Sequence, residues 1–434
     1  MAVRRVAVAY SGGRDSTALL HATLARAAEL GVQVLALHVH HGLSANADAW
    51  LAHCEAQCRR WSRGERRVEF VAQRLTDHPG SGESVEAWAR EQRYAALRSM
   101  ARAHGASIVW LAHHRQDQAE TLLLQALRGA GVAGLAGMPK SVVRNGITWQ
   151  RPWLGRSPTE IEAYVRRHRL KHIDDDTNSD LRFARNRLRL HVWPTLTAAF
   201  GQVEVAFAAS AGWAQEADAA LRELAAIDLA QVASPDGMIV VAWRALSLPR
   251  RSNVLRSWLK TQRGAPAPAS LVGRLLDELP TKRSARWPLG SDELRLHRGL
   301  LKLAAGAPSA PAIAPPESRL TVSRAGSHPL PGWAGTLRVE RVREGGVPLA
   351  WLAHLELRAR IGAERFQSGI GRPPRSLKKQ FQAAGVPMWE RAGPIVYSGG
   401  QLVFVPGLGL DARVIGLPGQ PLVRLRWIPF ERER

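Results

Sequence analysis

The sequence predicts an α/β protein. We expect a doubly wound parallel-sheet domain at 1–200, a mostly helical domain at 201–303 and a small C-terminal α/β domain at 319–434. Over the first part of the chain, short apolar runs alternate with helical patterns, which is typical of a parallel sheet. After Phe200 the segments become alanine-rich and helical. Residues 304–318 are rich in Ala and Pro and read as a linker.

The elements of the first domain can be placed in order. Apolar runs predict strands at 3–10, 32–39, 68–71, 108–112 and 147–150. Helical patterns predict helices at 16–30, 46–63 and 83–104, and Gly31 and Gly105 suit the ends of the first and third. Ser157-Pro158-Thr159-Glu160 predicts a further helix start, with Ser157 as N-cap and Glu160 completing a capping box.

The first strand and the first helix are joined by a glycine-rich turn, Ser11-Gly12-Gly13-Arg14-Asp15-Ser16. Glycine lets the backbone approach a ligand closely, and free N–H groups at a helix start attract an anion. The serine hydroxyls add donors, and the Asp15 carboxylate suits a hard cation such as Mg²⁺. The lysine of the common mononucleotide loop is absent here. The alternative is an ordinary strand-to-helix turn.

Two more polar clusters follow predicted strands, at 38–43 and 113–117. Ligands of open parallel sheets bind where the strands end at their carboxyl side. Three clusters at one sheet edge therefore predict a single site. The stretch at 129–134 formally matches G-x-G-x-x-G, but it follows a helix, so the dinucleotide interpretation lacks its context.

The charge balance favours a polyanionic partner. The chain has 60 Lys+Arg against 37 Asp+Glu, a formal net charge of +23, and arginine supplies most of the excess. A genome whose base composition favours arginine codons would explain why arginine outnumbers lysine, but it would not explain the positive net charge. An acidic stretch at 174–180 precedes an arginine ladder, Arg182, Arg185, Arg187 and Arg189. These could be a solvated loop and a charged helix face, or carboxylates near a cation with arginines on phosphates.

Composition also indicates the cellular compartment of the protein and the state of its two cysteines. No apolar run has the length of a membrane span, and the first strand begins close to Met1, so we expect a cytoplasmic protein without a membrane partner. Cys54 and Cys58 are four residues apart on an expected helix. This spacing makes a structural disulfide or a closed zinc site improbable and indicates a reduced protein.

Ser-Gly-Gly-x-Asp-Ser resembles the PP-loop of ATP pyrophosphatases, which cleave ATP between the α and β phosphates. The other motifs stand in the order of one branch of that group, and the chain resembles the bacterial tRNA(Ile)-lysidine synthetase family over nearly its whole length. Besides the turn, the likeness rests on 38–43, 86–94, 111–121, 128–131, 185–189, 376–379 and 386–391.

The resemblance implies a reaction. ATP adenylates the C2 oxygen of the wobble cytidine of a tRNA(Ile) with a CAU anticodon, free L-lysine attacks C2, and AMP leaves. It implies ATP and Mg²⁺ as cofactors.

The resemblance also implies site residues. Asp117 is the expected catalytic carboxylate, with His113 beside it. The expected ATP-binding residues are Ser11, Gly12, Gly13, Arg14, Asp15, Ser16, His38 and His40, with Asp15 also on the metal. The expected tRNA contacts are Arg185, Arg187, Arg189, Lys378 and Lys379. The family often shows two adjacent Asp where this chain has Gln116-Asp117.

Three alternatives remain open from the residues alone. A PP-loop tRNA thiolase would deliver sulfur from cysteines, and only Cys54 and Cys58 exist. A metal-dependent hydrolase would use His40, His113, His114 and Asp117 and would bind a transition metal tightly. A non-enzymatic RNA-binding protein would satisfy the charge but not the glycine-rich turn. The sequence leaves monomer and homodimer open.

Overall fold

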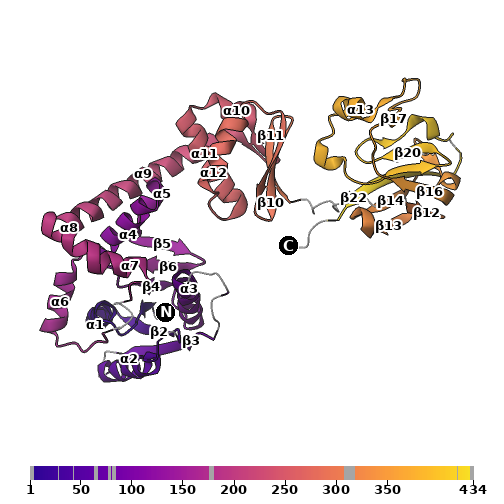
Figure 1. Ribbon diagram of the computed structural model, residues 1–434. Coiled ribbons are helices and arrows are strands. Elements are labelled where there is room, and N and C mark those ends of the chain that lie inside the picture. The colour runs from indigo at the N-terminus through magenta and orange to yellow at the C-terminus, as the bar shows by residue number, and fades with distance from the viewer. Residues whose placement is uncertain are drawn as a thin grey trace. The chain divides into compact units, whose positions relative to one another are not determined.

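The computed structural model describes residues 4–27, 29–42, 44–62, 67–76, 80, 85–174, 180–306, 318–417 and 419–430. It divides into two compact units, Met1–Arg222 and Glu223–Arg434. Figure 1 labels their helices and strands. None of the described helices is long and apolar enough to cross a membrane.

The first unit is built on a parallel sheet. In the described residues it has six strands in the order β3-β2-β1-β4-β6-β5, and only β5 runs antiparallel to its neighbour. The strands are β1 (Arg4–Ala9), β2 (Val32–His40), β3 (Val68–Arg74), β4 (Ile108–Trp110), β5 (Ser141–Arg144) and β6 (Ile147–Gln150). Because β1 lies between β2 and β4, the turns that follow β1 and β4 open at the same sheet edge. The predicted parallel sheet is confirmed.

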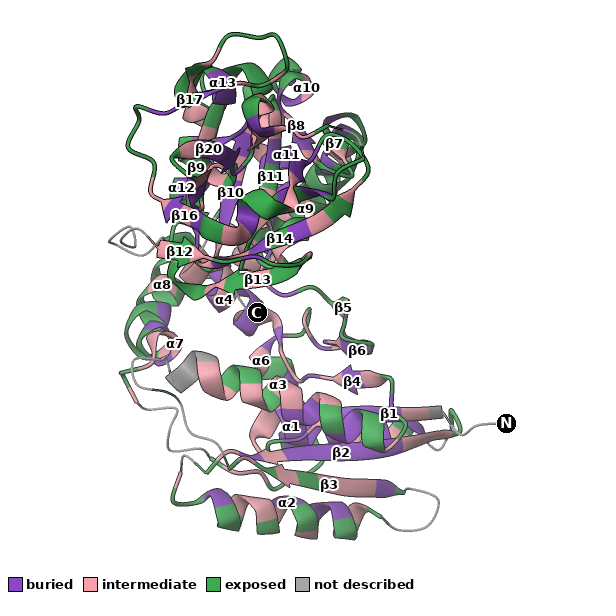
Figure 2. Ribbon diagram, turned by 90° about the vertical axis from the view of Figure 1, so that its right-hand side faces the viewer, coloured by how far each residue is buried: buried purple, intermediate pink, exposed green. Residues whose placement is uncertain are grey.

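Helices cover both faces of this sheet because side chains alternate along each strand. On one face Val8 and Ala36 pack with Cys54 and Ile161. On the other, Leu35 packs with residues of α3. Figure 2 shows the central strands β1 and β2 buried between these layers. The helices are α1 (Arg14–Ala27), α2 (Ala47–Trp61), α3 (Val85–Ala103), α4 (Arg115–Leu127), α5 (Val132–Leu135) and α6 (Pro158–Arg167).

Three residues of the arginine ladder, Arg185, Arg187 and Arg189, lie on an irregular helical segment. After α6 come α7 (Ala184–Arg187), a π-helical turn η2 (Leu188–Val192), α8 (Trp193–Ala199) and the long α9 (Val203–Val232). π-helical turns occur often at functional sites. The acidic stretch that precedes the ladder is described only at Asp174 and Asp180, and 175–179 lie outside the described residues.

The second unit begins with a domain that we predicted to be mostly helical, and this prediction is wrong. Its described part contains a five-stranded antiparallel sheet in the order β7-β8-β11-β10-β9, beside the end of α9 and three further helices. Trp287 and Leu289 alternate with exposed neighbours, and the hairpins turn at Gly290 and Gly299, both with positive φ. The period-2 pattern of these short strands was outweighed by the alanine-rich segments before them. The elements are β7 (Ala233–Ser234), β8 (Gly237–Ile239), α10 (Val240–Ala245), α11 (Leu248–Arg263), α12 (Ala269–Glu278), β9 (Ser284–Leu289), β10 (Asp292–His297) and β11 (Leu300–Ala305).

The C-terminal part, predicted to be small and α/β, is largely antiparallel β structure. Its described residues form sheets in the orders β12-β16-β19-β20-β21, β13-β14-β22-β15 and β17-β18. Most of the predicted linker, 307–317, lies outside the described residues. The strands are β12 (Ser318–Leu320), β13 (Gly326–Leu330), β14 (Gly335–Val342), β15 (Val347–Pro348), β16 (Leu355–Arg358), β17 (Arg365–Phe366), β18 (Arg375–Ser376), β19 (Ile395–Ser398), β20 (Gln401–Val405), β21 (Gly409–Leu410) and β22 (Leu422–Pro429). The helical elements are α13 (Leu377–Ala384), η3 (Pro331–Trp333), η4 (Leu349–His354), η5 (Met388–Glu390) and η6 (Ala412–Val414).

Candidate active site

The glycine-rich turn forms a compact loop between β1 and α1. The Ser16 hydroxyl donates to the Gly13 carbonyl at 3.0 Å and lies 3.1 Å from the Ser11 hydroxyl. The Thr17 hydroxyl donates to the Gly12 carbonyl at 3.0 Å. These contacts fix the loop at the start of a helix, where backbone N–H groups can receive an anion.

Gly12 cannot carry a side chain in this loop. Its φ is +88°, and an added Cβ would lie 2.5 Å from Ile173 Cδ1 and 2.7 Å from Cys54 Sγ. The Ile173 amide also donates to the Gly12 carbonyl at 2.9 Å. The loop is therefore closely backed by protein on one side.

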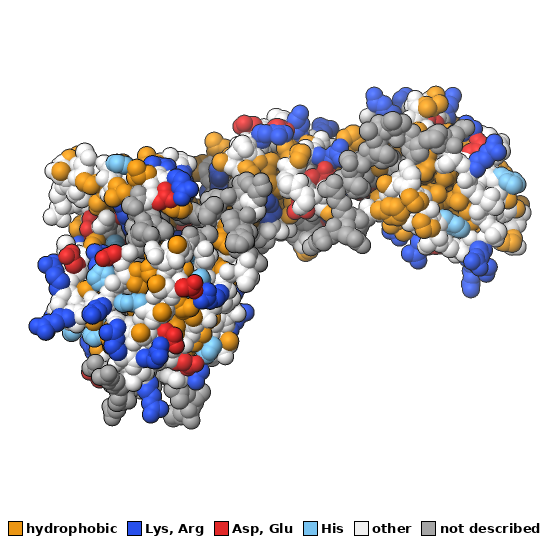
Figure 3. Space-filling view, turned by 60° about the horizontal axis from the view of Figure 1, so that its bottom comes forward, with side chains coloured by type: hydrophobic (Ala, Val, Ile, Leu, Met, Phe, Trp, Pro, Cys, Tyr) orange, Lys and Arg blue, Asp and Glu red, His pale blue; other side chains and the backbone are white. Residues whose placement is uncertain are grey.

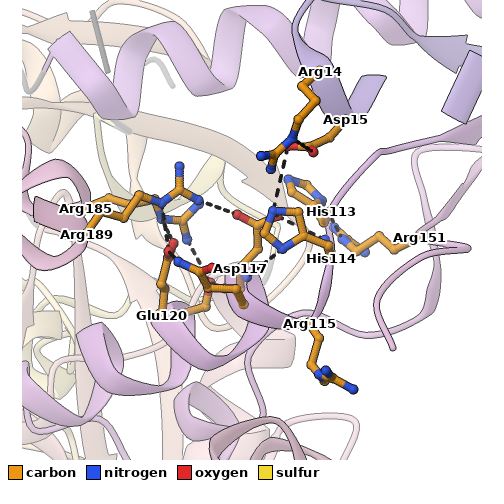
Figure 4. Close-up of polar contacts among 12 residues, drawn as sticks. Arg14, Asp15, His113, His114, Arg115, Asp117, Glu120, Arg151, Arg185 and Arg189 are labelled. Carbon is orange, nitrogen blue, oxygen red and sulfur yellow. Dashed lines mark hydrogen bonds and ion pairs between the residues drawn. The ribbon is translucent and has the colours of Figure 1, made fainter. Parts of the chain in front are cut away.

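The second cluster, at the end of β4, forms the start of α4. His114 is the N-cap, and its ring Nδ1 accepts from the Asp117 amide at 3.3 Å. The Asp117 carboxylate accepts from the His114 amide at 3.0 Å, which completes a capping box. With Nδ1 accepting, the proton resides on Nε2, which lies 3.4 Å from Asp117 Oδ2 and 3.7 Å from Asp15 Oδ2. His114 thus connects the glycine-rich turn to Asp117 (Figure 4).

Two carboxylates of α4 share one arginine. An Arg189 Nη atom lies 2.6 Å from Asp117 Oδ1, and its Nε lies 2.7 Å from Glu120 Oε1. Glu120 is completely buried and Asp117 is 7% exposed. Burial alone would raise the pKa of Asp117, but the nearby His114, His113 and Arg189 bring this pKa below its ordinary value. Asp117 therefore stays ionised at neutral pH.

Glu120 keeps one open acceptor. Its Oε1 also accepts from Gln116 Nε2 at 3.0 Å. Its Oε2 is buried without a hydrogen-bond partner among the described residues, and Arg185 Nε lies 3.7 Å from it. A buried carboxylate oxygen without a donor is costly, and it suits a ligand that brings one. Glu120 was missed by the sequence analysis. An acidic residue one helical turn beyond Asp117 was the available signal.

His113, which we predicted beside the reacting groups, lies against Arg151. The Arg151 Nε donates to His113 Nδ1 at 3.2 Å. Burial, followed by the neighbouring positive charges of Arg151, Arg93 and Arg90, lowers the pKa of His113 to about 3, although Asp117 opposes this. His113 is therefore neutral at physiological pH and suits hydrogen bonding better than proton uptake.

The two histidines predicted near adenosine differ in their contacts. His38 shares a hydrogen bond between its Nδ1 and the Tyr10 carbonyl at 2.9 Å, and burial lowers its pKa. It thus lies under the glycine-rich turn. His40 Nε2 instead lies 3.2 Å from Asp48 Oδ1 and 3.4 Å from an Arg74 Nη atom. The described contacts join His38, but not His40, to the turn.

The residues predicted to contact tRNA have unlike surroundings. Arg185 and Arg189 face the Glu120 carboxylate, whereas Arg187 donates to the carbonyls of Leu181 and Arg182. On α13, two further predicted residues, Lys378 and Lys379, are exposed. Lys and Arg side chains are also spread over the face of the molecule shown in Figure 3.

The cysteines do not suit sulfur transfer. Cys54 and Cys58 are free and buried. Burial raises the pKa of each thiol to about 12, so neither is a thiolate at neutral pH. Among the residues that the structure describes, no three His, Cys, Asp or Glu side chains are grouped so that they could hold a metal ion.

The chain matches three family models. Residues 1–196 match the PP-loop domain, 240–301 the TilS substrate binding domain, and 355–427 the TilS substrate C-terminal domain. It is 40% identical to the tRNA(Ile)-lysidine synthase of Burkholderia mallei, covering 94% of this chain and 89% of the relative. It is also 40% identical to that of Ralstonia nicotianae (96% and 91% covered) and 38% identical to that of Pseudomonas aeruginosa (97% and 93% covered).

Proposed function

Because the chain belongs to the tRNA(Ile)-lysidine synthase family of ATP-dependent ligases, we propose that its glycine-rich turn binds ATP and that Asp117 and Glu120 receive lysine. One observation carries the proposal. His114 Nε2 lies within 4 Å of both Asp15 and Asp117, so the turn and the buried carboxylates form one site. A reaction that adenylates the C2 oxygen and then joins C2 to an amine needs these two parts side by side.

The turn holds the ATP phosphates. Its backbone N–H groups at the start of α1 and the hydroxyls of Ser11 and Ser16 are the donors. The C2 oxygen of the wobble cytidine attacks the α-phosphorus, the α–β bridge breaks and pyrophosphate leaves. The adenylated C2 is then open to attack by an amine.

Asp15 fits a magnesium ion as one ligand of several. Mg²⁺ is usually held by one or two carboxylates together with substrate phosphates. Asp15 is partly exposed and belongs to the turn. Its Oδ1 accepts from Arg14 Nε at 2.8 Å, and its Oδ2 lies 3.7 Å from His114 Nε2. When bound, the ion would neutralise charge on the departing pyrophosphate.

Lysine enters as an ammonium ion, and the buried carboxylates are its complement. Glu120 Oε2 accepts an N–H, and ionised Asp117 lies one helical turn away. The carboxylates orient the amine and remove its proton as the C2–N bond forms and AMP leaves. Arg189 balances their charge while the site is empty of lysine. His113 contributes a neutral hydrogen bond.

The tRNA is bound by basic surfaces in both units. A wobble base must be splayed out of its loop to reach the site, which requires an extended contact with the rest of the tRNA. We assign the phosphate contacts to Lys378 and Lys379, with Arg185 nearest the site. Arg187 is engaged by its own backbone and serves local structure first.

The test is incorporation of labelled L-lysine with ATP and a tRNA(Ile) carrying either a CAU or a GAU anticodon. We expect incorporation only with CAU. Asp15→Ala should abolish tRNA-dependent pyrophosphate release while tRNA binding remains. Asp117→Asn should block lysine incorporation. Undiminished pyrophosphate release in Asp15→Ala, or a normal lysidine yield in Asp117→Asn, would refute the corresponding assignment.

A further inference from the structure

A cavity lies in the first unit, on the side of α4 opposite Asp117. Its volume is about 360 Å³, and it is open to solvent. Three cationic side chains line it, Arg115, Lys140 and Arg156, and no acidic residue does. The remaining walls come from α4, the segment before α6, and α9, with two amides, Gln118 and Gln215.

The walls are fixed by buried hydrogen bonds. Gln118 is 3% exposed; its Nε2 donates to the Met138 carbonyl at 3.0 Å, and its Oε1 accepts from the Met138 amide at 2.8 Å. Gln215 Nε2 donates to the carbonyls of Ala136 and Met138 at 2.8 and 3.0 Å. The Arg115 amide donates to the Arg156 carbonyl at 2.9 Å. The cavity is therefore pre-formed, and a ligand would not have to order it.

Its cations are only partly neutralised. Arg115 Nε is paired with Glu204 at 2.7 Å, and an Arg156 Nη atom lies 3.8 Å from Glu160 Oε1. Lys140, which is exposed, has no carboxylate within 4 Å among the described residues. Two acidic partners against three cations leave a net positive cavity, which attracts anions.

The cavity is separate from the lysine site but adjacent to it. Arg115 and Asp117 are two residues apart on α4, which is about 3 Å of rise and roughly 200° of rotation, so their side chains leave opposite sides of the helix. Figure 4 shows Arg115 directed away from Asp117 and His114. The ATP, lysine and metal roles assigned above use none of the residues that line this cavity.

We propose that this cavity binds the phosphodiester backbone of a nucleotide that flanks the reacting cytidine in the tRNA. This rests on the proposed function, since it takes the anticodon loop to be at the neighbouring site. A volume near the lower end of ligand pockets suits one nucleotide. An opening to solvent lets a strand enter and leave, and cations on separate walls suit a phosphate held between them. The amide nitrogens of Gln118 and Gln215 already donate to backbone carbonyls, so the contact positions the strand through its phosphates and not through its bases.

The test compares two double variants of the full chain. Lys140→Gln with Arg156→Gln removes two exposed charges from the cavity. The matched control, Arg26→Gln with Arg59→Gln, removes two exposed charges from α1 and α2 whose ion pairs, 3.8 and 3.6 Å, resemble that of Arg156. The measurement is the affinity for CAU tRNA(Ile) over a range of salt concentrations. We expect the slope of log affinity against log salt to fall in magnitude by about 1–2 in the cavity variant, and to change by less than half as much in the control.

Two results would overturn the proposal. One is an unchanged salt slope in the cavity variant; if inhibition by added inorganic pyrophosphate is lost at the same time, the cavity is a site for a free anion. The other is an equal change in both double variants, which would indicate general electrostatics. The wild type separates these failures from a failure of the proposed function, because it must incorporate lysine in every case.

Discussion

Replacing Glu120 by Gln tests the lysine site most directly. The change keeps the size of a completely buried side chain and removes its charge. The lysine ammonium would then donate to a neutral amide oxygen. Hydrogen bonds to charged groups contribute about 1.5–3 kcal/mol and neutral ones about 0.5–1.5 kcal/mol. The difference of about 1–1.5 kcal/mol predicts a rise of about 5- to 13-fold in the KM for lysine.

The assay follows lysine incorporation at saturating ATP and tRNA, with tRNA-dependent pyrophosphate release in the absence of lysine as the second readout. We expect pyrophosphate release to stay close to wild type, because Glu120 has no contact with the glycine-rich turn among the described residues. Asp228→Asn is the matched control. Asp228 is equally buried and ion-paired with Arg250, but it lies outside the site, so its KM for lysine should not change.

An unchanged KM for lysine in Glu120→Gln would show that Glu120 does not bind lysine. A fall in pyrophosphate release as large as the fall in lysine incorporation would show that Glu120 acts in the ATP step. An equal rise in Asp228→Asn would show that the effect comes from weakened folding. Thermal unfolding of both variants checks this last point.

Three further outcomes are expected. Gly12→Ala should abolish ATP binding in a nucleotide titration, because the added Cβ would clash with two side chains. The control is Gly31→Ala, whose Cβ has no atom within 4 Å; it should cost only about 1–2 kcal/mol of backbone strain and keep ATP binding. The pKa of His113 is near 3 in the folded state and near 6.5 in the unfolded state, so the unfolded state takes up a proton first as the pH falls. His113 should therefore lower the free energy of unfolding by about 1–2 kcal/mol between pH 7 and pH 5. Chemical denaturation of His113→Asn should show a flatter pH dependence of stability than the wild type, and an identical dependence would contradict the buried neutral ring. Neutralising Lys378 and Lys379 should reduce the salt slope of tRNA binding by about 1–2, and an unchanged slope would assign both lysines to another role.

The sequence predicted the first unit well because its signals were local. The alternation of apolar runs with helices, the glycine-rich turn and the capping box at Ser157 and Glu160 each depend on a few consecutive residues. The second unit was mispredicted for the opposite reason. Its sheet pairs short strands such as β9 and β10, whose stability comes from Trp287 and Leu294 packing against helices that only the fold brings near.

In the site, too, residues marked by local signals could be predicted, and contacts that only the fold creates could not. Asp117 and the turn could be found because both follow predicted strands. The role of His114 as the connection between them could not, since its two carboxylate contacts come from positions about 100 residues apart. The family resemblance placed both His38 and His40 near ATP. The recorded partners of His40, Asp48 and Arg74, come instead from α2 and β3, so sharing a strand end did not give the two histidines the same surroundings.

Gln116, the residue that departs from the family pattern, makes a contact that explains its presence. Where the family often has a second aspartate, Gln116 donates a hydrogen bond to the buried Glu120, one helical turn further on. A carboxylate at 116 would instead face another carboxylate at that spacing and repel it. With glutamine, one oxygen of Glu120 is held by Gln116 and Arg189, and the other remains open. We therefore propose that Glu120 acts beside Asp117 as a second carboxylate of the site, with Gln116 as the residue that positions it.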